Sequence, residues 1–298
     1  MSALGRWRAQ TVRRILGVDL PAMSETLERT AGWESRLDNI ERGIAAQREL
    51  LRRERDGLPT VIEALGAVRL SPEYALAFEE REPLISVRIA SYEKTEELMD
   101  VAIASVLNQS YQNFEIIVVN DGPNEATREA LALLDDPRVH YEEFAERTRY
   151  PTDPHARWMV AGAPGMNRGA DLARGVWLAP LDDDDAFTPD HLEKLLALGL
   201  DRSSELAYGA LIQRNLINDT EERIWSSPPA ISQFSFQGAI YLRLLHSLFR
   251  YDESSWLVNE PGDWNLIRRM SAAGVTMAGI PDTVAVMNQV PYTHKDGS

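Results

Sequence analysis

The sequence contains no cysteine among its 298 residues, so disulfide bonds, thiolate catalysis and zinc–thiolate sites are all excluded. It also contains no apolar run of about 18 residues, the length that a membrane-spanning helix needs. The N-terminus shows no apolar core followed by a small-residue cleavage site, so no secretory signal is expected. Together these absences favour a reducing compartment, and we expect a cytoplasmic location.

The phosphate-binding and nucleophile motifs of three large enzyme classes are also missing. The sequence has no GxGxxG, no GxxxxGK(S/T) and no GxSxG pattern, which removes the dinucleotide fingerprint, the P-loop and the nucleophile elbow.

Positive charge is scarce over most of the chain. Residues 1–82 hold 13 basic and 14 acidic residues, so residues 83–298 carry −14 of the net charge of −15. No nucleic-acid partner is expected, and a phosphorylated ligand needs a metal or local donors to offset this charge.

The N-terminal part of the chain predicts helices and two kinds of partner. Residues 6–16 (RWRAQTVRRIL) form a basic amphipathic pattern that suits docking on the inner face of an anionic membrane, and packing on the protein's own surface is the alternative. Over residues 23–51 the apolar positions follow a 3-4 spacing, which fits a coiled coil and hence a homo-oligomer, or one long helix on the main domain. Gly57 and Pro59 are expected to end this helix. We interpret residues 1–80 as a helical extension.

Beyond residue 80 the pattern changes to alternating strands and helices. Strands are expected over residues 84–90, 114–120, 139–141 and 176–181, and helices over 95–107, up to 134, and over 166–174. Thr95 is expected to cap its helix. This alternation predicts an α/β domain over residues 81–298, with a mixed, mostly parallel sheet covered by helices on both faces. In such sheets ligands bind beyond the carboxyl ends of the strands, where Tyr92 and Asp121 are placed.

Four consecutive aspartates, residues 182–185, directly follow the apolar run WLAPL at the end of an expected strand. Like carboxylates repel one another, and burying them unpaired is costly. Their oxygens are hard ligands suited to Mg²⁺ or Mn²⁺, ions that commonly bridge a few carboxylates to substrate phosphates. The block therefore predicts a metal site, with a solvated acidic turn before the next helix as the alternative.

Several segments occur in the order typical of a known family. LISVRIASYEKTEELMDVAIASVLNQSYQNFEIIVVNDGPNEAT resembles the opening of family 2 glycosyltransferases, which have the GT-A fold, a Rossmann-like fold that binds nucleotide-diphospho-sugars. MNRGADLARGVWLAPLDDDDAFTPDHLEKL is similar to the family's Asn-x-Gly helix and aspartate motif. GDWNLIRRMSAAG resembles the segment that carries the catalytic base. The resemblance covers about residues 83 to 285 and implies a metal-dependent sugar transferase.

The resemblance places the donor on one set of residues. Ala90, Ser91 and Tyr92 stand where the nucleotide base is contacted, and Asp121 matches the acid that reads the base. Asn167 lies in the Asn-x-Gly helix and is assigned to the donor site. The implied cofactors are Mn²⁺ or Mg²⁺ and a nucleotide-sugar donor, with a UDP-sugar expected first. The implied acceptor is a hydroxyl of a glycan, a lipid-linked sugar or a small molecule.

The same resemblance assigns the metal and the base. Asp182 and Asp184 match the metal motif, and Asp183 between them is assigned to the ribose. His294 is a candidate third metal ligand, since some enzymes of this fold use a late histidine. Asp263 matches the general base of inverting members, and its alternative is an ordinary helix cap.

Two further expectations concern the loop and the rival functions. The segment of residues 142–164 is too long for a passive connection, so it suggests a substrate or lid loop, with an exposed disordered loop as the alternative.

Three rival functions stay open: a retaining transferase without a base, a nucleotidyltransferase and a catalytically silent oligomeric scaffold. The stretch SYEKTEEL argues against the nucleotidyltransferase, because it is not a glycine-rich basic loop.

Overall fold

The computed structural model describes residues 20–289, with side chains from residue 40 onward, and the chain divides after Arg55 into two units. Helix α2 runs from Leu20 to Arg69, through the region expected to be helical. Its apolar positions Ile40, Ile44 and Leu51 are exposed, so the coiled coil and the homo-oligomer stay predictions. No helix in the described part is both long and apolar enough to cross a bilayer. Residues 6–16 and their predicted membrane contact lie outside the described residues.

Helix α2 does not end at Gly57 and Pro59, so that prediction was wrong. Proline inside a helix removes one hydrogen bond and costs about 3 kcal/mol. On either side of it, Leu58 packs against the core and Leu65 is completely buried in it. Burying one such side chain stabilises by about 1.5–3 kcal/mol, so packing of this helix face offsets the proline. The boundary predicted at residue 80 stays a prediction, although Ala77 is buried in the same core.

The second unit is built on a mixed sheet. Its strands in the described residues are β1 Ile85–Ser91, β2 Phe114–Asn120, β3 Val139–Glu143, β4 Trp177–Asp182, β5 Ala186–Phe187, β6 Leu206–Asn215, β7 Thr220–Ile224, β8 Ala239–Leu242 and β9 Met277–Gln289. The order is β3-β2-β1-β4-β8-β6-β9-β5, and β7 pairs with β6. Strands β3, β2, β1 and β4 are mutually parallel, β6 is parallel to β9, and β8 is antiparallel to both of its neighbours. The predicted mostly parallel sheet is confirmed, and its first strands lie within two residues of the expected positions.

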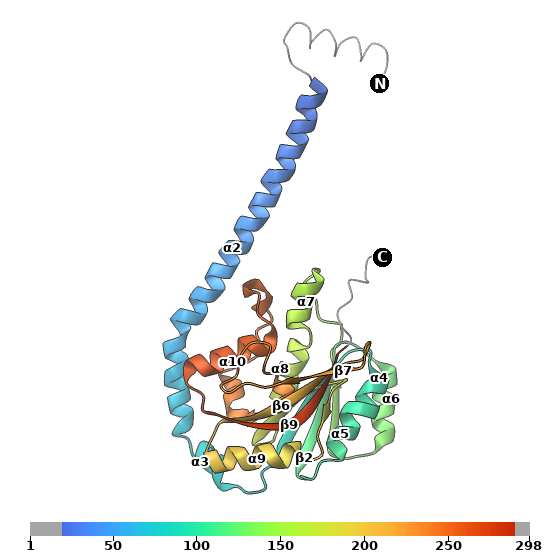
Figure 1. Ribbon diagram of the computed structural model, residues 1–298, viewed down its shortest axis with the longest axis vertical. Coiled ribbons are helices and arrows are strands. Elements are labelled where there is room, and N and C mark those ends of the chain that lie inside the picture. Colours follow the sequence, from blue (N-terminus) through green and yellow to red (C-terminus); the bar gives the residue numbers. More distant parts are fainter. Residues whose placement is uncertain (1–19, 290–298) are drawn as a thin grey trace. The chain divides into compact units, whose positions relative to one another are not determined.

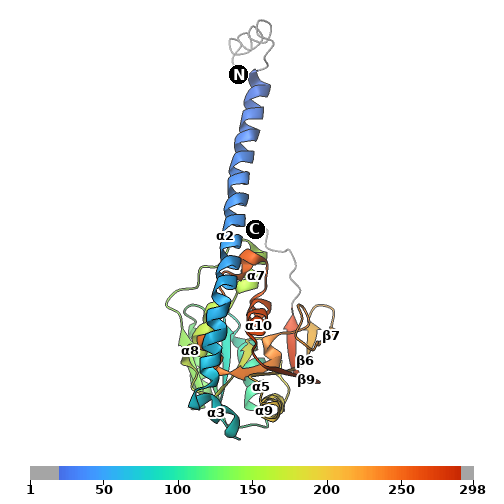
Figure 2. The same cartoon turned by 90° about the vertical axis from the view of Figure 1, so that its left-hand side faces the viewer.

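Helices cover both faces of this sheet, as predicted. They are α3 Pro72–Glu79, α4 Thr95–Glu97, η1 Leu98–Ile103, α5 Ala104–Leu107, α6 Glu125–Leu134, α7 Pro154–Val160, α8 Ala163–Leu172, α9 His191–Arg202, η2 Phe236–Gly238, η3 Arg243–Ser247, η4 Ser255–Val258 and α10 Gly262–Ala273. Helix α8 crosses β1 closely: a Cβ on Gly169 would stand 3.2 Å from the Cβ of Arg88. On the other face, α9 brings Gly199 against the indole of Trp177. In Figures 1 and 2 the strands accordingly run between α8 and α9.

Two local predictions need correction. Thr95 is not a cap but the first residue of α4, and its hydroxyl bonds to that of Thr127. The stretch 142–164, for which only a loop was expected, contains helix α7. The signal was present in the sequence: Asp153 caps α7 by accepting from the Ala156 amide at 2.8 Å, and Pro154 occupies the first helical turn.

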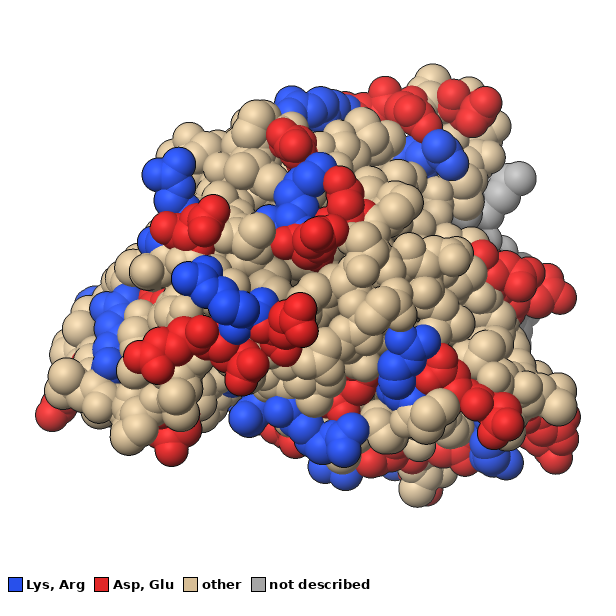
Figure 3. Space-filling model, turned by 90° about the horizontal axis from the view of Figure 1, so that it is seen from below, with Lys and Arg blue, Asp and Glu red and all other residues tan. Residues whose placement is uncertain are grey.

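Charge on the face of the molecule beneath α9 is mixed in sign. Figure 3 shows Lys and Arg interspersed with Asp and Glu over that face, rather than gathered into one patch. Nucleic-acid binding relies on a contiguous basic surface, and the face seen in Figure 3 offers none. The acids that matter most for function gather instead at the carboxyl ends of the strands.

Candidate active site

The parallel register brings the predicted site residues to one edge of the sheet. Ser91 at the end of β1 pairs with Asn120 at the end of β2, and Ala90 pairs with Asp182 at the end of β4. The amide of Asp121 donates to the Ser91 carbonyl at 2.8 Å. Because parallel strands in register end together, residues far apart in sequence become neighbours here.

One side of this edge is bordered by the long segment after β3. The guanidinium of Arg147 lies 3.8 Å from the centre of the Tyr92 ring, a cation–π contact. Asp121 accepts the amide hydrogen of Thr148 at 2.9 Å. Gly122 has a φ of +110° beside Arg147, where a side chain would be strained. Segment 147–148 therefore contacts the two residues predicted to receive the nucleotide base.

A lysine that sequence analysis did not single out pairs with the middle of the aspartate block. Lys94 Nζ lies 2.6 Å from Asp184 Oδ2 and 3.3 Å from Asp183 Oδ1. The Tyr92 amide also donates to Asp183 at 3.2 Å. Burial is the main cause that raises the pKa of Asp183, and Lys94 opposes it. The block is thus already in contact with a side-chain cation.

The outer two aspartates are held by different elements, η2 and β9, and their pKa values are strongly perturbed. Asp182 accepts from the amide of Gln237, and Asp185 accepts from the Asn288 amide at 2.7 Å. Burial, followed by the negative charge of Asp263 and of the neighbouring aspartates, raises the pKa of Asp182 to about 7. Burial and the neighbouring aspartates also raise the pKa of Asp185 well above its ordinary value. This edge therefore favours binding of positive charge.

A cavity of about 600 Å³ opens beside the block. Its walls carry the carboxylates of Asp182, Asp184, Asp185 and Asp263 together with apolar side chains. The apolar lining includes Trp158, Met159, Ile224, Ile231, Phe234, Trp264 and Met287. The cavity has the size of a small-molecule site, with acids at one end and aromatic surface around it.

Asp263 faces this cavity from the first turn of α10, but it is not the helix cap. The capping position is Pro261, and the carboxylate bonds instead to groups of other segments. Oδ1 accepts from the Tyr251 hydroxyl at 2.8 Å, and Oδ2 accepts from the Phe236 amide at 3.0 Å and from the Ser235 hydroxyl. Three donors therefore orient the Asp263 carboxylate.

Asn167 contacts the backbone of Tyr251 rather than the open edge. It is buried, and its amide accepts from the Tyr251 N–H at 2.9 Å and donates to the Tyr251 carbonyl at 3.0 Å. Gly262 lies beside the aromatic ring of Tyr251: a Cβ at position 262 would stand 3.2 Å from Tyr251 Cδ1. Asn167 fixes the segment that reaches Asp263, and its donor-binding role stays a prediction.

Lys94, Ser235, Gln237 and Tyr251 are the site residues that the sequence analysis missed. Lys94 follows the predicted base-binding tyrosine by two residues, so a basic side chain at a strand end was a usable signal. The other three come from segments between β7 and α10 that carry no motif. His294 lies outside the described residues, and among the side chains of residues 40–289 no three His, Asp or Glu groups are placed to hold a metal by themselves.

The mixed sheet with an acidic cavity at its strand ends defines an α/β protein with a ligand-sized site, and comparison with known proteins gives its family. Residues 86–272 match the family described as Glycosyl transferase family 2. This match covers more than half of the chain, so the protein belongs to that family.

Curated relatives match this chain over only part of their own length. Succinoglycan biosynthesis protein ExoO of Rhizobium meliloti is 33% identical over 114 residues, which cover 38% of this chain and 29% of that protein. An uncharacterized glycosyltransferase of Haemophilus influenzae is 30% identical over 114 residues, covering 38% and 32%. The matches thus span about a third of these relatives.

The solved structure of S. aureus TarS 1–349 in complex with UDP-GlcNAc superimposes with a TM-score of 0.54 at 13% identity. The match covers 72% of this chain and 61% of that one. At this identity the likeness concerns the fold, and it confirms the predicted GT-A fold.

Proposed function

We propose that the protein is a glycosyltransferase that moves a sugar from a nucleotide-diphosphate donor to an acceptor hydroxyl, with inversion at the sugar. The observation that carries the proposal is the cavity in which the aspartate block and Asp263 face a common space. Family membership supports the reaction class, and a UDP-sugar is the donor we expect first because TarS was solved with UDP-GlcNAc.

The carboxylate oxygens of the aspartate block are ligands that suit a hard divalent ion. Asp182 and Asp184 are the residues that would hold Mn²⁺ or Mg²⁺. Burial and the neighbouring acids raise the pKa of Asp182, so a cation bound beside its carboxylate would relieve the repulsion between these acids. Ions of this class commonly take only one or two carboxylates and complete their shell with water and substrate phosphates, so a third protein ligand is not needed. When bound, the ion supplies Lewis-acid stabilisation of the leaving diphosphate.

The chain's own residues serve the donor and the acceptor separately. Tyr92 and Asp121 offer a ring and a carboxylate to the nucleotide base, and Asp183 is assigned to the ribose. Lys94 adds a cation beside Asp184, where diphosphate charge would lie. Trp158 and Trp264 line the cavity and offer flat apolar surface to a sugar ring.

Asp263 is the proposed general base. A carboxylate oxygen has two lone pairs. Oδ2 already accepts two hydrogen bonds, from Ser235 and the Phe236 amide, whereas Oδ1 accepts one, from Tyr251. Oδ1 is therefore the atom expected to take the acceptor proton as the hydroxyl attacks the sugar.

The first test is calorimetric binding of UDP, GDP, dTDP and CDP, each with and without Mn²⁺. The variant Asp184→Asn removes one carboxylate charge of the block. The matched control is Asp201→Asn, the same change on an exposed residue of α9. We expect metal-dependent binding of one nucleotide, lost in Asp184→Asn and kept in Asp201→Asn.

Absence of binding by all four nucleotides, with the protein folded, would contradict the transferase proposal. Equal nucleotide binding by both variants would contradict the role given to Asp184 in the donor site. The proposed transfer reaction would then have to rest on the other residues of the site.

A further inference from the structure

A fully buried arginine lies in the middle of the sheet. Arg88 belongs to β1, in register between Ile117 of β2 and Pro180 of β4, and it is 1% exposed. Its neighbours along the strand are apolar, and Gly169 of α8 lies directly over its Cβ. A buried charge is costly unless it is paired, yet no carboxylate within residues 40–289 forms an ion pair with it.

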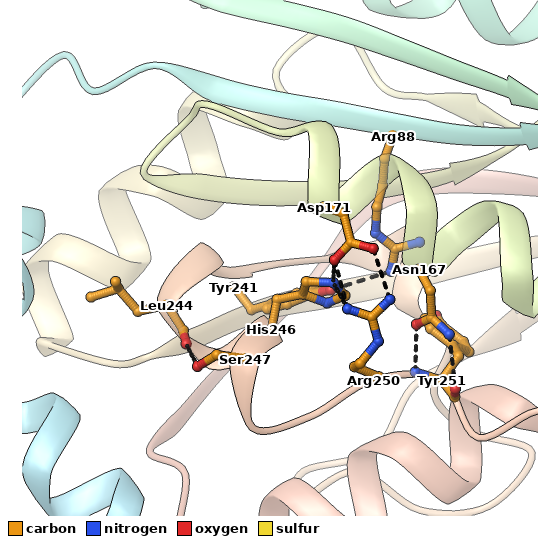
Figure 4. A network of polar contacts seen from close by, with 9 residues as sticks. All are labelled: Arg88, Asn167, Asp171, Tyr241, Leu244, His246, Ser247, Arg250 and Tyr251. Carbon is orange, nitrogen blue, oxygen red and sulfur yellow. Dashed lines mark hydrogen bonds and ion pairs between the residues drawn. The ribbon is translucent and has the colours of Figure 1, made fainter. Parts of the chain in front are cut away.

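The contacts of the Arg88 guanidinium are instead with aromatic and sulfur groups. It donates to the Tyr241 hydroxyl at 3.2 Å and to Met166 Sδ at 2.6 Å. Its central carbon lies 5.1 Å from the centre of the Tyr251 ring, and its Nε has no hydrogen-bond partner among the described residues. Figure 4 shows the side chain reaching beneath α8 toward Tyr241 and Tyr251. A charge kept under these conditions suggests a role other than stability.

Tyr251 connects this buried cation to the candidate base. Its backbone is held by Asn167, and the preceding residue, Arg250, forms an ion pair with Asp171 at 2.6 Å (Figure 4). The ring lies against Arg88, and the hydroxyl donates to Asp263 Oδ1. Burial, and then the charge of Asp263, raise the pKa of Tyr251 well above its ordinary value, so the phenol keeps the proton that it donates.

We propose that Arg88 is a positioning residue for the transfer reaction: its guanidinium holds the Tyr251 ring in the place from which the hydroxyl orients Oδ1 of Asp263. The inference rests on the proposed function for its kinetic effect. The backbone of Tyr251 is fixed by Asn167, but the direction of its ring depends on what lies against the ring face. The Phe236 ring, 6.0 Å away between centroids, and Gly262 also border the Tyr251 ring. Arg88 supplies the charged contact, and a cation attracts an aromatic face more strongly than an apolar group does.

The experiment compares Arg88→Met, Arg88→Lys, Tyr251→Phe and the double variant Arg88→Met/Tyr251→Phe over a range of donor concentrations at saturating acceptor, which yields kcat and the KM for donor. Met has a similar length but no charge, and it should pack in this apolar strand. Arg174→Met is the control, because Arg174 pairs with Glu115 away from the cavity. We expect Arg88→Met to lower kcat by about ten- to hundredfold, as misplacement of a catalytic group does, with the KM for donor unchanged. Arg88→Lys should recover part of the loss.

The thermal midpoint and the double variant separate positioning from a structural role. Replacing a buried charge by an apolar side chain of similar volume is often neutral or stabilising, so Arg88→Met should melt no earlier than wild type. If Arg88 acts through the Tyr251 hydroxyl, adding Arg88→Met to Tyr251→Phe should lower kcat no further. Additive effects, or an unchanged kcat in Arg88→Met, would overturn the proposal.

Crystal structures of wild type and Arg88→Met give a readout that does not need activity. We expect the contact between the Tyr251 hydroxyl and Asp263 to lengthen beyond hydrogen-bond distance in the variant. An unmoved Tyr251 would refute the positioning role even if the protein transferred no sugar. A displaced Tyr251 in a protein without transferase activity would support the role and reject the proposed function.

Discussion

Replacing Asp263 by Asn tests the proposed base with little change of shape. The amide keeps the size of the side chain but cannot take a proton at neutral pH. A general base typically contributes a factor of about 10² to 10⁴ in rate, which corresponds to about 2.7–5.4 kcal/mol of transition-state stabilisation. We therefore expect kcat to fall by that factor, with the affinity for the nucleotide unchanged because no contact of the aspartate block is removed.

The hydrogen bonds of Asp263 also limit how far this substitution should change the stability of the protein. Three donors converge on the carboxylate, and one of its oxygens becomes an NH₂ group that cannot accept. The hydroxyls of Tyr251 and Ser235 can rotate to accept from this group, whereas the Phe236 amide cannot. The Phe236 amide donates to Oδ2, so an NH₂ group in the place of Oδ1 leaves that amide satisfied and meets only the Tyr251 hydroxyl, which can turn to accept. Asp263→Asn should therefore remain folded.

The assay is a time course of product formation at saturating substrates, with the anomeric configuration of the product read by proton NMR. Asp282→Asn is the matched control, because Asp282 is exposed and pairs only weakly with Lys194, at 3.4 Å. A kcat within about threefold of wild type in Asp263→Asn would remove the base role. Together with a retained configuration, it would establish a retaining transferase on the same fold.

Three other perturbations are predicted from single contacts. Glu205→Gln breaks a bidentate ion pair between the buried Glu205 and the partly exposed Arg69 and should lower the free energy of unfolding by about 1–3 kcal/mol in urea titrations at pH 7. Although burial opposes it, the hydrogen bond from Arg69 helps to lower the pKa of Glu205 from 4.5. The wild-type advantage is thus complete above pH 4.5 and should shrink as pH falls through the folded value. Lys94→Met removes the cation beside the aspartate block and should tighten Mn²⁺ binding without nucleotide in calorimetry, while an unchanged affinity would show that the ammonium does not compete. Gly199→Ala places a methyl group 2.8 Å from a core indole and should destabilise by about 1–3 kcal/mol in thermal unfolding, whereas Gly66→Ala, with nothing within 4 Å in α2, should stabilise by up to about 1 kcal/mol. Equal effects of the two alanines would refute the packing argument.

Much of the fold was predictable because its first strands are mostly apolar and rich in β-branched residues. Residues 84–90 and 114–120 do not alternate regularly between apolar and polar side chains, which favours strands buried on both faces in a parallel sheet with helices on either side. That sheet then aligns the carboxyl ends of its strands, so the proximity of Tyr92, Asp121 and the aspartate block followed from the pattern. The continuation of α2 through Pro59 did not follow, since it depends on what Leu65 packs against.

The sequence by itself determined the α/β class, the sheet and the edge at which the acids gather, because periodicity and strand direction are local properties of the chain. Only the tertiary structure decided how each acid is held. Lys94 pairs with Asp184 across 90 residues, and Gln237 reaches Asp182 across 55. The donors to Asp263 come from a 3₁₀ turn and a loop that carry no motif. Such contacts depend on the directions of side chains from separate elements, and those directions are fixed only when the elements pack.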